Sequence, residues 1–158
     1  VILILSPQAW LTGEDPSPEF IRTGPLVHEY THLVFDCLVN GNYPRWFTEG
    51  LAQYFEYRIN GYEWLTPDNN LKGGLYTLAD LDSRFDNLPN QALAYRQSLA
   101  MVRYIAEVRG ENQLRQVIEQ LKAGRRMNQA IENALGMSYG EFDAAWRAWA
   151  VKSADRSY

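Results

Sequence analysis

Apolar side chains recur at helical spacing along most of this chain, and Asn-Gly pairs or single glycines interrupt the pattern. The spacing predicts one helix over residues 25–39 and a second over 44–59, each followed by an Asn-Gly pair that favours a helix end. From about residue 91 onward the pattern predicts further helices, whose apolar stripes we interpret as core. The chain is therefore expected to be mainly helical.

Two stretches depart from the helical pattern. Residues 1–5 are all Val, Ile or Leu and precede a Ser-Pro pair, which predicts a short buried strand. Residues 62–92 are rich in Gly, Pro and Asn and contain one short helical patch near residues 78–81. A long irregular connection is often functional, and we expect this one to form part of a cleft rim. The predicted class is α+β, mainly helical.

Length and composition are those of an ordinary globular domain. The 158 residues are 46% hydrophobic and 22% charged, and 15 Lys+Arg against 19 Asp+Glu give a formal net charge of −4. A mild negative charge without a basic run argues against nucleic acid as a partner. The apolar run at residues 1–5 is too short to span a membrane, and it lacks the basic flank of a signal peptide.

The single cysteine and the first residues of the chain bear on compartment and processing. One cysteine cannot form an internal disulfide, so cysteine usage does not decide the redox environment. The chain lacks an initiator Met and starts inside an apolar run, and we therefore expect a processed form or a domain excised from a longer chain. A secreted or cell-envelope protein is favoured over a cytoplasmic one.

The sequence His28-Glu29-Tyr30-Thr31-His32 lies inside the first predicted helix. Residues four apart on a helix differ by about 40° in direction and about 6 Å in height, so both imidazoles can bind one metal ion. Glu29 flanks that face, where its carboxylate can reach a metal-bound water without ligating the metal. Two neutral nitrogens and an adjacent carboxylate suit zinc, with Glu29 as the general base of a hydrolase.

The surroundings favour a metal site over a chance match on a solvated helix. The only two histidines of the chain both fall in this motif, within an apolar stretch that predicts burial. Buried imidazoles need partners, because unsatisfied buried polar groups are costly. Cys37 points away from both histidines and is expected to be a small core residue. Phe35 and Leu38 stand where the metzincin pattern requires Gly and His, which excludes that subclass.

The second predicted helix offers a third ligand, since zinc enzymes usually supply three from the protein. Glu49 stands among Trp46, Phe47 and Leu51, an apolar setting in which a carboxylate needs a cation. Gly50 costs about 1 kcal/mol against Ala inside a helix, so we expect the two helices to approach closely there. An exposed helix glutamate is the alternative interpretation of Glu49.

The segments His28-Glu29-x-x-His32 and Trp46-x-x-Glu49-Gly50-Leu51-Ala52 resemble the gluzincin metallopeptidases, most closely the peptidase-MA-like group. The resemblance implies a zincin-like domain with a short N-terminal strand, an active-site helix, a glutamate helix and a C-terminal helical bundle. It also implies that His28, His32 and Glu49 ligate Zn²⁺ and that Glu29 is the base. The strand would be a sheet edge that pairs with the substrate backbone, although an ordinary core strand fits equally well.

Attack on a peptide carbonyl builds an oxyanion, which a hydrogen-bond donor usually helps to stabilise. Both histidines are used as ligands, so a tyrosine or an arginine must be the donor. Tyr95 is the preferred candidate, because it opens a helix after the irregular segment and is similar in placement to a tyrosine of the aminopeptidase branch. A helix-packing role is its alternative, and Arg96, Tyr62 and Tyr76 are competitors.

Metal-bound histidines generally donate their other N–H to a carboxylate or carbonyl. Asp36 lies one turn beyond His32, and Glu56 lies two turns beyond Glu49 on nearly the same face of its helix. Either carboxylate could orient a histidine, and either could be a surface charge. We favour Glu56.

These residues together predict a zinc metallopeptidase in which Glu29 activates a zinc-bound water to hydrolyse a peptide or protein substrate. A non-catalytic zinc-containing binding or scaffold module is the alternative, against which the presence of Glu29 argues. An amide or ester hydrolase for other substrates is a third. We expect one domain over 1–158, with a zinc-binding half at 1–61, the cleft segment at 62–92 and a helical half at 93–158. Substrate preference, endo- or exopeptidase action and oligomeric state stay open.

Overall fold

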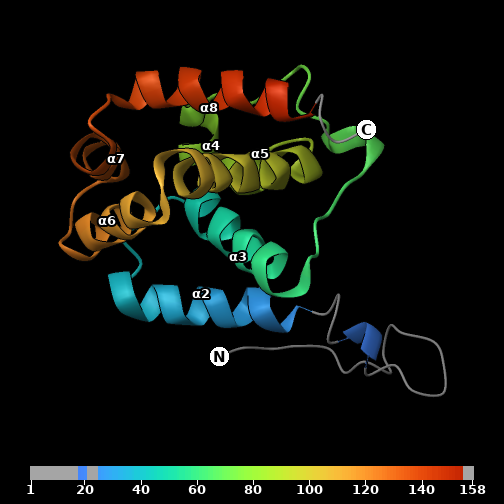
Figure 1. The fold of residues 1–158 in the computed structure, drawn as a ribbon, viewed down its shortest axis with the longest axis horizontal. Helices are drawn as coiled ribbons and strands as arrows, with labels where there is room; N and C mark the ends of the chain where they lie inside the picture. Colours follow the sequence, from blue (N-terminus) through green and yellow to red (C-terminus); the bar gives the residue numbers. More distant parts are fainter. Residues whose placement is uncertain (1–17, 21–24, 155–158) are drawn as a thin grey trace.

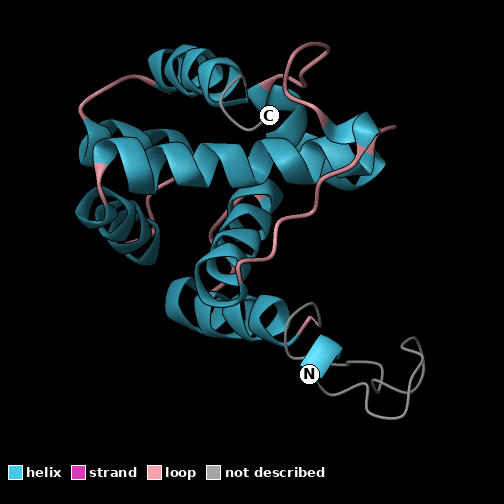
Figure 2. Ribbon diagram, turned by 45° about the vertical axis from the view of Figure 1, so that its right-hand side comes forward, coloured by secondary structure: helices cyan, strands magenta, loops and turns pink. Residues whose placement is uncertain are grey.

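The computed structural model of this chain describes residues 18–20 and 25–154, which are mostly helical (Figure 1, Figure 2). The longer helices are α2 (Leu26–Val39), α3 (Arg45–Asn60), α4 (Leu78–Ser83), α5 (Gln91–Arg103), α6 (Glu111–Lys122), α7 (Met127–Leu135) and α8 (Tyr139–Ala154). The described residues contain no strand, so the mainly helical expectation is confirmed for them. The strand predicted at residues 1–5 lies outside the described residues.

The first two helices begin and end where the sequence indicates. Asn40 follows α2 with φ 53° and ψ 47°, a left-handed conformation that Asn tolerates, and Gly41 continues it with φ 71°. Pro44 precedes α3, where its missing N–H removes no helical hydrogen bond. Gly61 ends α3 with φ 67°. The short turn between α2 and α3 brings the second helix back across the first (Figure 1).

Helix α3 is the centre of the fold, with α2 on one side and α5 on the other (Figure 1). Every residue from 46 to 54 is buried, including the polar side chains of Thr48, Glu49 and Gln53. Because buried polar groups need partners, each of these side chains must find a hydrogen bond or an ion pair inside the protein.

The second half of the chain packs as a helical bundle against α3. Helix α5 continues as a π-helix, Tyr104–Arg109, which ends at Gly110. The expectation that the apolar stripes of this half are core is confirmed, since Ile105, Leu121, Ile131 and Trp146 are fully buried. The segment from 62 to 92 holds α4 and two short 3₁₀ helices, Pro67–Asn69 and Phe85–Asn87, and attaches to the core through buried leucines and Phe85.

Two expectations about α2 are wrong. Cys37, expected in the core, is exposed. The helix as a whole was expected to be largely buried, but Phe35 and Val39 are its only buried residues. The apolar residues of α2 indicate that the helix tends to be buried, but they do not indicate which of its sides contacts another described helix.

Gly50 marks a close helix approach, but the partner is α5 rather than α2. A Cβ atom added at Gly50 would lie 2.4 Å from the backbone oxygen of Ser98 and 2.7 Å from Cγ2 of Val102. The Ser98 oxygen belongs to the backbone of α5, so it cannot move aside without displacing that helix. The absence of a side chain at Gly50 therefore sets the distance between α3 and α5.

Gly50→Ala is expected to lower the free energy of unfolding by about 2 kcal/mol, the usual scale for overpacking a core. The gain of about 1 kcal/mol from the better helix propensity of Ala offsets part of the clash. Urea denaturation followed by circular dichroism measures the change. Gly140→Ala in α8 is the matched control, because a Cβ there meets nothing within 4 Å. Equal stability of the two variants would show that α5 does not confine Gly50.

Candidate metal centre

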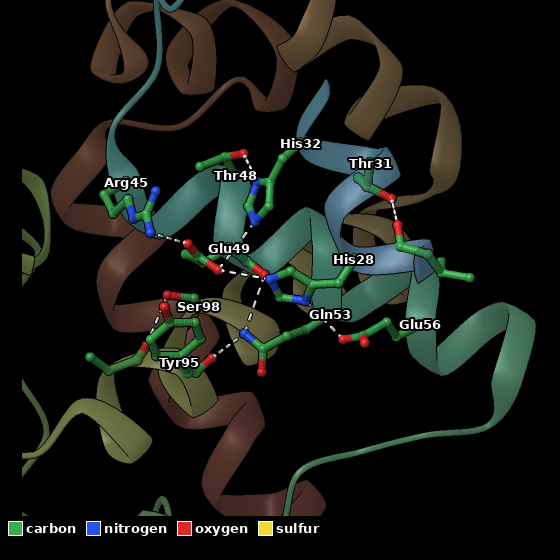
Figure 3. A network of polar contacts seen from close by, with 12 residues as sticks. His28, Thr31, His32, Arg45, Thr48, Glu49, Gln53, Glu56, Tyr95 and Ser98 are labelled. Atoms are coloured by element: carbon green, nitrogen blue, oxygen red, sulfur yellow. Dashed lines mark hydrogen bonds and ion pairs between the residues drawn. The ribbon is translucent and has the colours of Figure 1, made fainter. Parts of the chain in front are cut away.

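Three potential metal ligands meet where α2 and α3 cross (Figure 3). One ligand atom from each of His28, His32 and Glu49 lies within 4.8 Å of the others. The Nε2 atom of His28 is 3.1 Å from Oε2 of Glu49, and the Nε2 atom of His32 is 3.4 Å from the same oxygen. Both imidazole rings thus direct their Nε2 atoms toward the same oxygen of Glu49.

The groups in this cluster carry opposite charges. Burial raises the pKa of Glu49, but hydrogen bonds to His28 and His32 and the charge of Arg45 outweigh it and lower the pKa to about 2. Burial lowers the pKa of His28, but hydrogen bonds to Glu49 and Glu56 raise it to about 9. Glu49 is therefore a carboxylate at neutral pH although it is only 1% exposed.

A second hydrogen bond fixes each imidazole ring (Figure 3). Nδ1 of His28 lies 2.9 Å from Oε2 of Glu56, and Nδ1 of His32 lies 2.7 Å from Oγ1 of Thr48. These contacts turn the Nε2 atoms toward Glu49. Glu56 thus lies against a histidine, where the sequence-based interpretation places it. No sequence pattern indicates Thr48, because its contact with His32 depends on how the two helices cross.

Asp36, the alternative to Glu56 as the residue that orients a histidine, has another partner among the described residues. Its carboxylate accepts a hydrogen bond from the hydroxyl of Tyr43 at 3.0 Å. Arg45 is instead the additional charged residue at the cluster, with Nη2 at 2.8 Å from Oε1 of Glu49. The i,i+4 spacing of Arg45 and Glu49 is a signal of this pair that the sequence contains.

A cavity of about 430 Å³ lies beside the cluster. Its lining includes His28, Glu29, Glu56, Tyr62, Trp64 and Tyr95. Tyr62 and Trp64 belong to the segment from 62 to 92, which therefore forms one wall of the cavity. Glu29 is partly exposed and lines the cavity together with His28.

Tyr95 lies in the wall of this cavity, as its predicted role requires. Its ring packs edge-on against Trp64 and Phe85, with centroid distances of 6.1 and 5.4 Å. Burial and the negative charge of Glu49 raise the pKa of its phenol. The hydroxyl therefore stays protonated at neutral pH and can donate a hydrogen bond.

The competitors of Tyr95 as hydrogen-bond donor differ in their partners and in whether they line the cavity. The guanidinium of Arg96 pairs with Glu63. The hydroxyl of Tyr76 accepts a hydrogen bond from the backbone N–H of Asn90 at 2.8 Å, and Tyr76 is not among the residues that line the cavity. Tyr62 lines the cavity together with Tyr95 and stays a candidate donor.

The donor set of the cluster fits zinc. Two imidazole nitrogens and one carboxylate oxygen form the three-ligand set of catalytic zinc sites, which keep one further position for water or substrate. Each donor side chain is also held by a second hydrogen bond or ion pair. Among the described residues, this is the one group of three such side chains close enough to share an ion.

Comparison with known proteins gives one match. A family model described as the peptidase MA superfamily matches residues 17–152, which include the whole cluster and the cavity. Comparisons with curated proteins and with solved structures found no match. No helix among the described residues has the length and apolar character needed to cross a membrane.

Proposed function

The chain belongs to the peptidase MA superfamily, and from this premise we propose that it is a zinc metallopeptidase of the gluzincin type acting on peptide or protein substrates. The proposal depends chiefly on one observation, the convergence of His28, His32 and Glu49 beside a cavity that Glu29 also lines. The three candidate metal ligands, the candidate general base and a cavity for the substrate thus lie together. The family of the chain suggests peptidase action.

His28 and His32 would hold the ion through their Nε2 atoms, and Glu49 through a carboxylate oxygen. Zinc bound there would polarise the scissile carbonyl and make a water molecule more acidic. Glu56 and Thr48 fix the two rings by hydrogen bonds to Nδ1, so the nitrogens keep their direction without reorganisation.

Glu29 and Tyr95 are the groups in the cavity that would act on the substrate. The Glu29 carboxylate would take a proton from the attacking water and pass it to the leaving amine. The Tyr95 hydroxyl, which is protonated at neutral pH, would donate a hydrogen bond to the oxygen that becomes negative in the transition state.

Zinc-dependent peptide hydrolysis tests the proposal. The purified protein is expected to cleave an unstructured protein substrate, to lose this activity after dialysis against a chelator, and to regain it with one equivalent of zinc. Mass spectrometry identifies the cleaved bonds, and the Glu29→Gln protein controls for contaminating peptidases. Binding of one equivalent of zinc without hydrolysis of any peptide would instead identify a non-catalytic zinc module.

Glu56→Gln is expected to weaken zinc binding by roughly 10–100-fold, the usual cost of losing a hydrogen-bonded partner of a ligand histidine. The variant removes the carboxylate that lies 2.9 Å from Nδ1 of His28. Competition with a zinc-sensitive dye measures the affinity. Asp36→Asn removes a carboxylate that contacts Tyr43 rather than a histidine, so it should keep the native affinity. Similar losses in both variants would contradict a specific role of Glu56.

A further inference from the structure

The side chain of Gln53 lies between the candidate metal centre and Tyr95 (Figure 3). It follows the candidate ligand Glu49 by one turn of α3, and it is only 8% exposed. It also lines the cavity that contains His28 and Glu29 in its wall. A buried polar side chain needs partners for its donor and acceptor atoms, so both ends of this amide bear on what the cavity can bind.

The nitrogen end of the Gln53 amide joins two helices. Nε2 donates one hydrogen bond to the backbone oxygen of Glu49 at 3.2 Å and one to the backbone oxygen of Tyr95, in α5, at 2.8 Å. Both N–H groups of the amide are therefore used. Rotating the amide by half a turn would place its oxygen against two carbonyl oxygens, which cannot donate, so these contacts fix the orientation of the amide.

The oxygen end of the same amide is an available acceptor. Oε1 of Gln53 has no hydrogen-bond partner among the described residues, and no dashed contact ends on this oxygen in Figure 3. Thr66 Oγ1 is the one buried side-chain polar atom of the described chain without a partner, so Oε1 of Gln53 is not sealed inside the protein. Because Gln53 lines the cavity, the cavity is the space from which a ligand can reach Oε1.

The carboxylates of the cavity do not duplicate this acceptor. Glu56 contacts His28, and Glu63 pairs with two arginines. Glu29 is the candidate base. Oε1 of Gln53 is thus an acceptor that is neither charged nor engaged by the described chain. A neutral acceptor suits an uncharged N–H, such as that of a peptide bond, whereas a terminal ammonium group is bound more strongly by a carboxylate.

We propose that Gln53 is a substrate-binding residue, and that its Oε1 accepts a hydrogen bond from a backbone N–H of the peptide being hydrolysed. The inference rests on the proposed function and adds which part of the substrate the cavity recognises. Gln53 and Glu49 are separated by one helical turn, about 6 Å. An extended peptide advances about 3.3 Å per residue, so the N–H belongs to a residue within about two positions of the cleaved bond. The two bonds at Nε2 hold the acceptor in place before the substrate arrives, which lowers the cost of binding.

Ester substitution in the substrate tests this contact, because an ester lacks the N–H of the amide that it replaces. The probe is a peptide around a bond that the native protein cleaves, with one ester in turn at each amide within two residues of that bond, the cleaved bond itself excepted. We expect one of these esters to lower kcat/KM of the native protein roughly tenfold, the scale of one hydrogen bond to a buried acceptor. In Gln53→Met, whose side chain has the same length but no amide, the same ester should change kcat/KM by less than about twofold.

Gln91→Met is the matched control. Nε2 of Gln91 also donates to two backbone oxygens, at 2.8 and 2.9 Å, but this residue does not line the cavity. The control should keep the native response to every ester. Equal ester responses in the native protein and in Gln53→Met would overturn the inference and leave the proposed function unaffected.

The native protein alone can also decide against the contact, even where Gln53→Met fails to fold. If no ester in the series lowers kcat/KM of the native protein, the cavity does not bind a backbone N–H there and the inference is wrong. A dependence on Gln53 that appears only when a terminal amine is acetylated would assign Oε1 to that amine and overturn the backbone assignment. Absence of hydrolysis of any peptide by the zinc-loaded native protein would instead overturn the proposed function, and this inference with it.

Discussion

Replacing Glu29 by Gln is expected to lower kcat for peptide hydrolysis by on the order of 10³-fold, within the range for loss of a general acid-base group. The amide keeps the size of the side chain, but it cannot accept and release a proton at neutral pH. Glu29 lines the cavity and is not one of the three converging ligands. Zinc content should therefore stay at the native level.

The kinetic constants on one peptide substrate and the zinc content of the same preparation together decide the role of Glu29. Asp36→Asn, which removes a carboxylate from the same helix, should keep the native kcat because Asp36 contacts Tyr43 and not the histidines. A native kcat in Glu29→Gln would remove Glu29 from the mechanism. A low kcat accompanied by loss of zinc would make it a ligand rather than a base.

Glu49→Gln is expected to weaken zinc binding by more than roughly 100-fold, the cost of losing a hydrogen-bonded partner of a ligand histidine. Loss of the zinc should abolish the activity as well. The Nε2 atoms of His28 and His32 both face one oxygen of this carboxylate. Burial opposes ionisation, but these histidines keep the pKa of Glu49 lowered to about 2, so the native site presents an anion. A neutral amide is not among the usual zinc ligands.

Dye competition gives the zinc affinity of Glu49→Gln, and circular dichroism shows whether the metal-free variant is folded. Glu56→Gln, on the same helix, should fall between the native protein and Glu49→Gln. If a folded Glu49→Gln protein binds zinc as tightly as the native one, the buried carboxylate is not a ligand and the proposed three-ligand site fails.

The meeting of the three candidate ligands could be predicted because its geometry is mostly local. The i,i+4 spacing of His28 and His32 places both imidazoles on one side of a helix. The turn after α2 is short, so the next helix must return beside the first. The apolar neighbours of Glu49 indicate burial, and the structure places this residue at 1% exposure.

The contacts between helices could not be predicted, because they depend on crossing angle and register. Thr48 lies beside His32 for this reason. Asp36 has a suitable direction relative to His32, but Tyr43 is within its reach and forms the hydrogen bond. The glycine at position 50 indicated a close approach, and the pattern contained no information that α5 would be the partner.

Helical periodicity also could not predict that the side of α2 that carries Cys37 is exposed. An apolar pattern all round a helix indicates that the helix tends to be buried, but burial requires a neighbour that the pattern does not name. Among the described helices, α3 and α6 contact α2, and the side that carries Cys37 stays exposed. The expected core position of Cys37 is wrong for this reason.

Metal analysis of the purified protein, loaded with zinc and then desalted, tests most directly whether two helices hold one ion between them. We predict one zinc per chain in the native protein and less than about a tenth of that in the His28→Ala/His32→Ala variant. A native protein without stoichiometric zinc, or a double variant that still retains one zinc per chain, would contradict the assignment of these side chains as the metal site.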